Sequence, residues 1–236
     1  MLWKKVLTED VKNCLPWDEK SPYHVVANLS YRPHIVRHGE TRANVDGYLQ
    51  GWSDDPLNEN GIRLAEITGQ QMTGIKIDCC LSSPLRRAKE TAEIILRESA
   101  NRDVQIEIDE RIKEINFGSY ERISTNAPEV KLFFPDPFHC PQFPDGENVQ
   151  MVMARTQEFL RKLIQRNDEK TYLIATHGCA LRAMLNFLYE DSADFWHGHV
   201  PYNCSVNIVE AKDGVAKLIA DDMIYYPEEM IVDRYK

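Results

Sequence analysis

The stretch His34-Ile35-Val36-Arg37-His38-Gly39 decides the fold of this chain. Its apolar pair predicts a short buried strand over 34–36, and a cation, an imidazole and a glycine follow at the strand's end. A second segment, Thr171-Tyr-Leu-Ile-Ala175, predicts another strand that ends in Thr176-His177-Gly178. Ligands of open α/β sheets bind beyond the carboxyl ends of the strands. If the two strands are neighbours, His38 and His177 project into one pocket.

The other elements follow from periodicity and turn residues. Further strands are expected over 77–81 and 104–108, and a hairpin over 206–209 and 215–219. Apolar residues spaced three and four apart predict helices over 58–72, 84–96, 147–165 and 181–188. Asn58 is the expected cap of the first helix, and Ser83 with Pro84 the expected start of the second. Strands that alternate with helices predict an α/β fold: a three-layer α/β/α sandwich with a mostly parallel central sheet and an antiparallel edge strand.

The domain organisation is simple. Residues 1–31 have no clean period and are expected to form an N-terminal extension, so residues 32–236 form one domain. Within it, residues 117–146 are rich in proline and aromatic residues, as in FFPDPFHCPQFPDG (133–146), and predict an irregular lid.

The composition limits the kinds of binding partner that are expected for this chain. The chain has 236 residues and a formal net charge of −9, which would repel DNA or an anionic membrane on average. Its six cysteines form no Cys-x-x-Cys pair, so most are expected to be buried, reduced thiols. The charged N-terminus has no signal-peptide pattern, and no 18-residue apolar run is present. These features predict a cytoplasmic protein.

An anion site is expected where the second helix begins. Arg86 and Arg87 lie in its first turn, although a helix N-terminus favours acidic groups. Arginine grips phosphate oxygens in pairs, so at least one of the two is expected to bind an anion. Gly178 opens another helix, whose N-terminal dipole would point into the same pocket.

These motifs together resemble the histidine phosphatase superfamily, the phosphoglycerate-mutase-like group. The matching pieces occur in the family's order over roughly residues 33–220: RHGET (37–41), Asn44, QGW (50–52), DDPLNENG (54–61), SSPLRRAKET (82–91), EINFG (114–118), DGEN (145–148) and THG (176–178). An isolated Arg-His-Gly would be weak evidence, whereas the ordered set is specific.

The resemblance implies a role for each matching residue. His38 matches the nucleophile that becomes phosphohistidine, and Glu114, four residues before Gly118, matches the proton donor. The groups that bind the phosphoryl oxygens match Arg37, Arg87 and His177. The residues that line the phosphate site match Asn44 and Gln50. Arg86 is then the arginine that faces solvent.

The chemistry places demands on these groups. His38 must be neutral, and a backbone carbonyl is expected to hold its other ring nitrogen. Glu114 must be protonated for the first step, so burial or the phosphate should raise its pKa. Arg37, Arg87 and a protonated His177 would stabilise the phosphoryl charge, so no metal or other cofactor is expected.

The predicted function is a metal-independent phosphatase that hydrolyses small phosphate monoesters through phosphohistidine. The partner is a small phosphorylated metabolite of unspecified identity, with no nucleic acid and no membrane, and the sequence does not define an oligomeric state. Two alternatives stay open: a cofactor-dependent phosphoglycerate mutase, and an inactive binding module on the same fold. The 117–146 segment has no paired arginines and is rich in Phe and Pro, which favours a phosphatase and a partly apolar leaving group.

Several other residues have two interpretations. Asp109, Glu110 and Glu121 are rivals of Glu114. Glu147 either orients pocket groups or caps the 147–165 helix, and Asn148 stands where the family often has serine. Three further expectations concern residues outside the motifs: Arg182 on a helix surface, Cys179 in apolar packing, and only a minor prospect of a metal site at His197-Gly198-His199.

Overall fold

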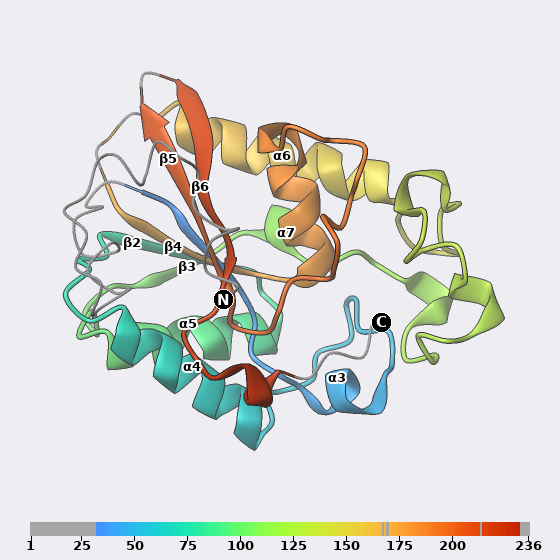
Figure 1. Cartoon of the computed structure of the whole chain (residues 1–236), viewed down its shortest axis with the longest axis horizontal. Helices are drawn as coiled ribbons and strands as arrows, with labels where there is room; N and C mark the ends of the chain where they lie inside the picture. Colours follow the sequence, from blue (N-terminus) through green and yellow to red (C-terminus); the bar gives the residue numbers. More distant parts are fainter. Residues whose placement is uncertain (1–31, 167, 169, 213, 232–236) are drawn as a thin grey trace.

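The computed structural model describes residues 32–231 apart from residues 167, 169 and 213. The expected N-terminal extension, residues 1–31, lies outside this part of the chain. A six-stranded sheet forms its centre, in the order β3-β2-β4-β1-β5-β6 (Figure 1). The strands are β1 (His34–Arg37), β2 (Cys79–Ser82), β3 (Ile106–Ile108), β4 (Tyr172–Thr176), β5 (Val206–Lys212) and β6 (Val215–Met223).

The strand directions place both His-Gly pairs at the same end of the sheet, after the carboxyl ends of their strands. Strands β3, β2, β4 and β1 run parallel, whereas β5 is antiparallel to both β1 and β6. Strand β1 pairs directly with β4, with Arg37 opposite Thr176. The predicted α/β sandwich with an antiparallel edge is therefore confirmed, as is the adjacency of the two strands that end in histidine.

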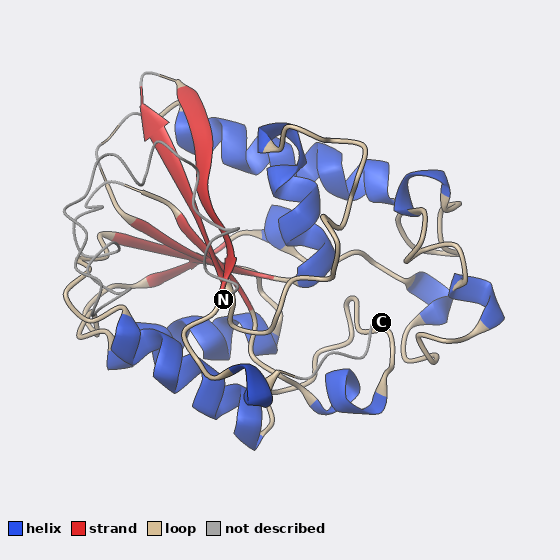
Figure 2. Ribbon diagram, viewed as in Figure 1, coloured by secondary structure: helices blue, strands red, loops and turns tan. Residues whose placement is uncertain are grey.

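Helices cover both faces of the sheet (Figure 2). Helices α4 (Glu59–Gln71) and α5 (Arg86–Glu98) lie on one side, and α6 (Val149–Ile164) and α7 (Gly178–Leu185) on the other. A short helix, α3 (Arg42–Asp46), follows β1. Successive strand residues face opposite layers: Val36 belongs to the core under α5, whereas Ile35 belongs to the core under α6.

The observed first residues of the helices can be compared with the predicted N-caps. Asn58 caps α4, because its side chain accepts a hydrogen bond from the Gly61 N–H at 2.7 Å. Gly178 begins α7 as expected. The expected start at Ser83-Pro84 is wrong: α5 begins at Arg86, and its N-cap, Leu85, makes no side-chain cap bond. The Ser83 hydroxyl lies instead against the His177 ring.

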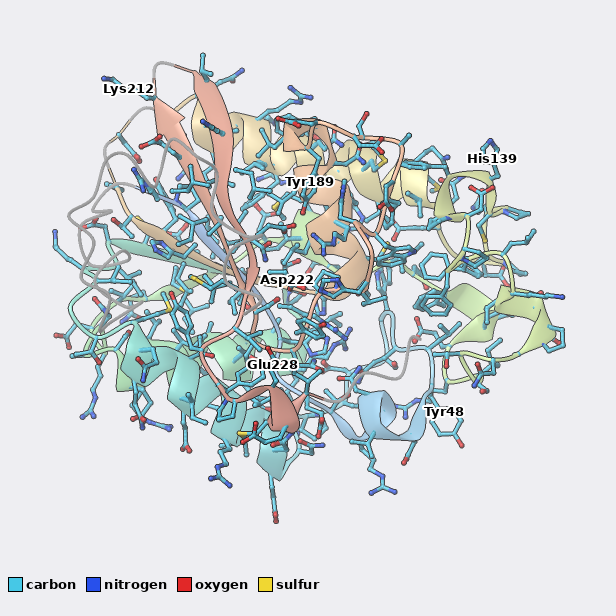
Figure 3. All side chains as sticks on the ribbon, viewed as in Figure 1. Tyr48, His139, Tyr189, Lys212, Asp222 and Glu228 are labelled. Atoms are coloured by element: carbon cyan, nitrogen blue, oxygen red, sulfur yellow. The ribbon has the colours of Figure 1, made fainter. Side chains whose placement is uncertain are left out.

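The 117–146 segment contains only short 3-10 helices, over Gly118–Tyr120, Pro128–Val130 and Pro137–His139. It extends beyond the end of the sheet, with His139 on its outer side (Figure 3). Its inner side carries Phe117, Phe133 and Phe143, which pack in one apolar cluster with Trp196. The segment is therefore irregular but has its own aromatic core.

The prediction that Arg182 lies on a helix surface is wrong. It is fully buried, and its guanidinium donates to the Tyr189 hydroxyl and to Asp221 at 2.9 Å. Figure 3 shows Tyr189 and Asp222 beside this part of α7. The reason is that α7 is enclosed on every side, and all eight of its residues are buried. A charged residue on such a helix needs buried partners.

The five described cysteines are free, and all except Cys79 are buried, as predicted. Cys14 lies outside the described residues. Within those residues no helix has both the length and the apolar character needed to cross a membrane.

Candidate active site

Three strand ends supply the centre of the site. His38 follows β1, His177 follows β4, and Ser83 follows β2. The rings of His38 and His177 lie 5.2 Å apart between centroids, and the His38 backbone N–H donates to the Thr176 carbonyl at 2.9 Å. The two imidazoles therefore lie beside each other, as expected, but only His38 lines the cavity.

The His38 ring is held in one tautomer. Its Nδ1 lies 2.7 Å from the Gly39 carbonyl oxygen. A carbonyl only accepts, so Nδ1 carries the proton and Nε2 keeps its lone pair. Burial, followed by the charges of Arg87 and Arg37, holds the pKa of His38 well below its usual value. The imidazole is thus neutral and nucleophilic at Nε2.

His177 is held by one hydrogen bond. Its Nε2 lies 2.8 Å from the Ser83 hydroxyl, whereas its buried Nδ1 has no hydrogen-bond partner among the described residues. Burial, then Arg87, holds the pKa of His177 well below its usual value, which favours a neutral imidazole. The predicted protonated form concerns a site that holds a phosphoryl group, whose charge would favour protonation, so it stays a prediction. A neutral imidazole can still donate one hydrogen bond.

The two arginines are fixed by backbone carbonyls. Arg37 donates through Nη1 to the Pro201 carbonyl, and its buried Nε has no partner among the described residues. Arg87 is fully buried and donates to the carbonyls of Gly51, at 2.7 Å, and Ser53, at 2.8 Å. Burial lowers its pKa to about 10, so it stays charged at neutral pH. Arg86 points outward to Glu90, as predicted.

Glu114 is the acidic group of the site. Its carboxyl accepts hydrogen bonds from the backbone N–H groups of Ile115, Cys179 and Ala180 at 2.9–3.1 Å. Burial raises the pKa of Glu114, and these bonds together with Arg87 oppose that rise. The α7 N-terminus, which was expected to serve the phosphate, therefore gives two of its N–H groups to Glu114.

The rivals of Glu114 have other partners. Asp109 pairs with Arg111 at 2.5 Å, and Glu110 pairs with Lys113 at 3.1 Å with 69% of its side chain exposed. Glu121 accepts N–H groups from the loop at Gly51. None of the three lines the cavity at His38, whereas Glu114 does.

Glu147 orients the segment that carries Glu114. Its carboxylate makes two bonds of 2.8 Å to Arg155, and it accepts the Asn116 N–H. The Arg155 guanidinium donates in turn to the carbonyls of Arg111, Lys113 and Glu114. Capping of α6 falls to Asn148, whose side chain accepts the Met151 N–H. Sequence reasoning missed Arg155, because the Glu147 carboxylate and the three backbone carbonyls that it binds are brought together only by the fold.

Asn44 and Gln50 line the cavity beside His38. The Asn44 amide oxygen accepts from the Thr41 backbone N–H at 3.1 Å. Its amide nitrogen is thereby turned away from Thr41. Gln50 accepts from the Thr41 hydroxyl at 2.8 Å and donates to Asp55 at 2.9 Å. Both side chains are held in place by short-range bonds.

Gly39 lets two backbone segments pack closely. Its N–H donates to the Thr91 hydroxyl at 2.9 Å. A Cβ at Gly39 would lie 2.6 Å from the Gly61 carbonyl oxygen, which is shorter than side chains allow. Glycine therefore lets β1 end against the first turn of α4. At Gly178 an added Cβ would lie 3.5 Å from Nε of Arg37, so the helix start lies close to that guanidinium.

A cavity opens at His38. It brings together six of the eight predicted site residues: Arg37, His38, Asn44, Gln50, Glu114 and Gly178. Arg87 and His177 are not among the lining residues. The rest of the wall is apolar and was only partly foreseen: Leu49, Phe117, Phe133, Phe134, Cys179, Trp196 and Val200.

The His197-Gly198-His199 segment has structural partners. The His197 ring stacks on Tyr189 with 3.5 Å between centroids, and His199 pairs with Asp222. Among the described residues no group of three or more His, Cys, Asp or Glu side chains is placed to hold a metal ion. Cys179 packs in the apolar cluster as expected, and burial raises the pKa of its thiol.

Comparison with known proteins gives the class. The profile of the histidine phosphatase superfamily (branch 1) matches residues 34–220, so the chain belongs to that superfamily. It is 32% identical over 179 residues to "Uncharacterized phosphatase PhoE" of Bacillus subtilis, covering 76% of this chain and 88% of that protein.

Two further similar proteins were found, one by sequence and one by structure. A 2,3-bisphosphoglycerate-dependent phosphoglycerate mutase of Methylobacterium is 30% identical over 165 residues, covering 65% of this chain and 78% of its own. The structure of YhfR from Bacillus stearothermophilus superimposes with a TM-score of 0.74 at 29% identity, covering 82% of this chain and 97% of that one. The relatives therefore include both phosphatases and mutases.

Proposed function

We propose that this protein is a metal-independent phosphatase that hydrolyses small phosphate monoesters through a phosphohistidine at His38. The observation that carries the proposal is the neutral His38 ring, whose Nδ1 donates to the Gly39 carbonyl and whose Nε2 is free to attack. A cytoplasmic location stays a prediction of the sequence.

The first step transfers the phosphoryl group to the protein. Nε2 of His38 forms a bond to phosphorus while the ester P–O bond breaks, and Glu114 gives its proton to the departing alkoxide. The raised pKa of Glu114 supports this role. Arg37 and Arg87 supply the positive charge that stabilises the transferring phosphoryl oxygens. A neutral His177 contributes a hydrogen bond.

The second step releases inorganic phosphate. Water attacks phosphorus, the P–N bond breaks, and Glu114 takes the proton of that water, which restores both groups. Asn44 and Gln50 line the cavity, which supports a role for them in orienting phosphate oxygens.

The proposal is tested by trapping the intermediate. We expect rapid acid-free quenching with a phosphorus-labelled aryl phosphate to leave an acid-labile label on His38, and steady-state phosphate release to be insensitive to EDTA. His38→Ala should abolish both the label and phosphate release, whereas His139→Ala, on the outer side of the 117–146 segment, should change neither. Phosphate release from His38→Ala at the unmodified rate would contradict the proposal.

The mutase relative makes phosphoryl exchange the second candidate. Incubation with 3-phosphoglycerate and its bisphosphate primer separates the two. Rapid formation of 2-phosphoglycerate with little free phosphate would establish a mutase. A protein that neither releases phosphate nor exchanges it would be the inactive binding module.

A further inference from the structure

The lining of the cavity at His38 contains two chemically different groups of side chains. The polar group comprises the phosphoryl-handling residues of the proposed phosphatase, among them Arg37, His38 and Glu114. The apolar group is larger and carries no charge: Leu49, Phe117, Phe133, Phe134, Trp196 and Val200. A leaving group held in this cavity must therefore lie against rings and aliphatic carbons.

The rings form a connected array from two distant parts of the chain. Phe134 stacks with Trp196 at 6.2 Å between centroids and an interplanar angle of 27°. Phe133 meets Trp196 edge-on at 5.7 Å and Phe117 edge-on at 5.4 Å. Phe133 is only 2% exposed and Trp196 only 9%, so packing holds both in place. The wall is thus a preformed aromatic surface.

The cations of the 117–146 segment do not line the cavity. Arg122 pairs with Asp55 at 2.8 Å and is 60% exposed, and Lys131 is exposed. Arg37, which directly precedes His38 in the chain, is the only Lys or Arg in the described lining. A second phosphate or a carboxylate on the leaving group would lose water there without gaining a cation, which is unfavourable.

We infer that the aromatic wall is a subsite for an uncharged, aromatic leaving group, so the preferred substrates are phosphate monoesters of aryl-bearing alcohols with one anionic group. This inference rests on the proposed phosphatase activity and specifies its substrate class. Aromatic groups offset against such rings gain both apolar burial and edge or stacking contacts.

A matched set of alkyl esters tests the subsite. Ethyl phosphate, 2-phenylethyl phosphate and 3-phosphoglycerate all expel an aliphatic alkoxide, so their demands on Glu114 are similar. We expect kcat/KM for 2-phenylethyl phosphate to exceed that for ethyl phosphate by about 10- to 100-fold, because burying a phenyl ring contributes at this scale. The carboxylate-bearing 3-phosphoglycerate should be no better than ethyl phosphate.

Phe134→Ala should reduce the phenylethyl-to-ethyl ratio of kcat/KM by about 10-fold, within the range for one altered apolar pocket contact. Leu132→Ala is the matched control, since Leu132 lies in the same segment, is 56% exposed and is outside the cavity lining; it should keep the ratio. Equal kcat/KM for the phenylethyl and ethyl esters, or preference for 3-phosphoglycerate, would overturn the subsite and leave the phosphatase standing. No phosphate from any ester would overturn the proposed function and the subsite with it.

Discussion

Two opposing effects act on the pKa of Glu114. Three backbone N–H groups favour its ionised form, and burial favours its protonated form more strongly, so the net pKa rises. The rate increase that a general acid contributes grows with the basicity of the leaving group. The residue is thus defined by its environment more than by its type.

We predict that Glu114→Gln lowers kcat by ~10²–10⁴ for 2-phenylethyl phosphate, the usual contribution of a general acid. The loss should be much smaller for formation of phosphohistidine from 4-nitrophenyl phosphate, because nitrophenolate leaves without a proton. Pre-steady-state release of nitrophenol measures that step.

Glu110→Gln is the matched control, because Glu110 is the exposed rival four residues earlier in the chain. It should leave both esters unaffected. Equal losses for the two esters in Glu114→Gln would show that Glu114 is not the proton donor.

At the scale of elements, a loop couples the 117–146 segment to Arg87. The Glu121 carboxylate accepts the N–H groups of Gly51, Trp52 and Ser53 at 2.8–3.2 Å. On their other side, carbonyls of the same loop accept from Arg87. The loop's peptide groups therefore lie between a carboxylate and a guanidinium, an arrangement that favours both charges.

Glu121→Gln should loosen this loop, because an amide NH₂ placed against three N–H donors repels them. We expect the inhibition constant of inorganic phosphate to rise by about 10-fold, equivalent to losing one charge-assisted hydrogen bond of about 1.4 kcal/mol at Arg87. Competitive inhibition of ester hydrolysis gives this constant.

Glu129→Gln, an exposed carboxylate in the same segment, is the control and should leave phosphate inhibition unchanged. If Glu121→Gln lowers thermal stability without changing phosphate inhibition, Glu121 only braces the loop and does not position Arg87.

At the scale of the whole molecule, buried histidines link stability to pH. Burial lowers the pKa of His34 to about 4, and the pKa values of His38 and His177 are also held well below the usual value. All three are neutral when folded, whereas the unfolded chain protonates them below pH ~6.5. The unfolded state then binds more protons, so stability is complete above that pH and falls as pH drops below it.

We predict that the free energy of unfolding falls between pH 7.5 and pH 5.5, with each histidine contributing at most about 1.4 kcal/mol per pH unit. The raised pKa of Glu114 acts in the opposite sense and offsets at most one of the three. Urea unfolding at several pH values measures the slope. His34→Gln, outside the site, should reduce the slope by up to one proton, and exposed His139→Gln should not. Stability that stays level or rises toward pH 5.5 would contradict the linkage.

Local patterns were sufficient to predict the elements and to nominate the residues that the structure brings together at His38. Apolar periodicity predicted the strands and most helices, and Asn58 was recognised as a cap because capping depends on residues three positions apart. The His-Gly pairs were informative because their position at strand ends is itself a local property. The order of the family motifs along the chain was enough to assign roles to His38, Glu114 and the arginines.

What the sequence by itself determined, then, was the α/β sandwich and the set of residues gathered at one edge of its sheet. Only the tertiary structure decided that the pKa of His177 is lowered, that the Ser83 hydroxyl contacts His177, that Arg182 is buried, and that aromatic residues from distant parts of the chain line the cavity at His38. The physical reason is that charge state and cavity shape depend on desolvation and on contacts between residues far apart in the chain. Sequence periodicity reports only which way a side chain faces within its own element.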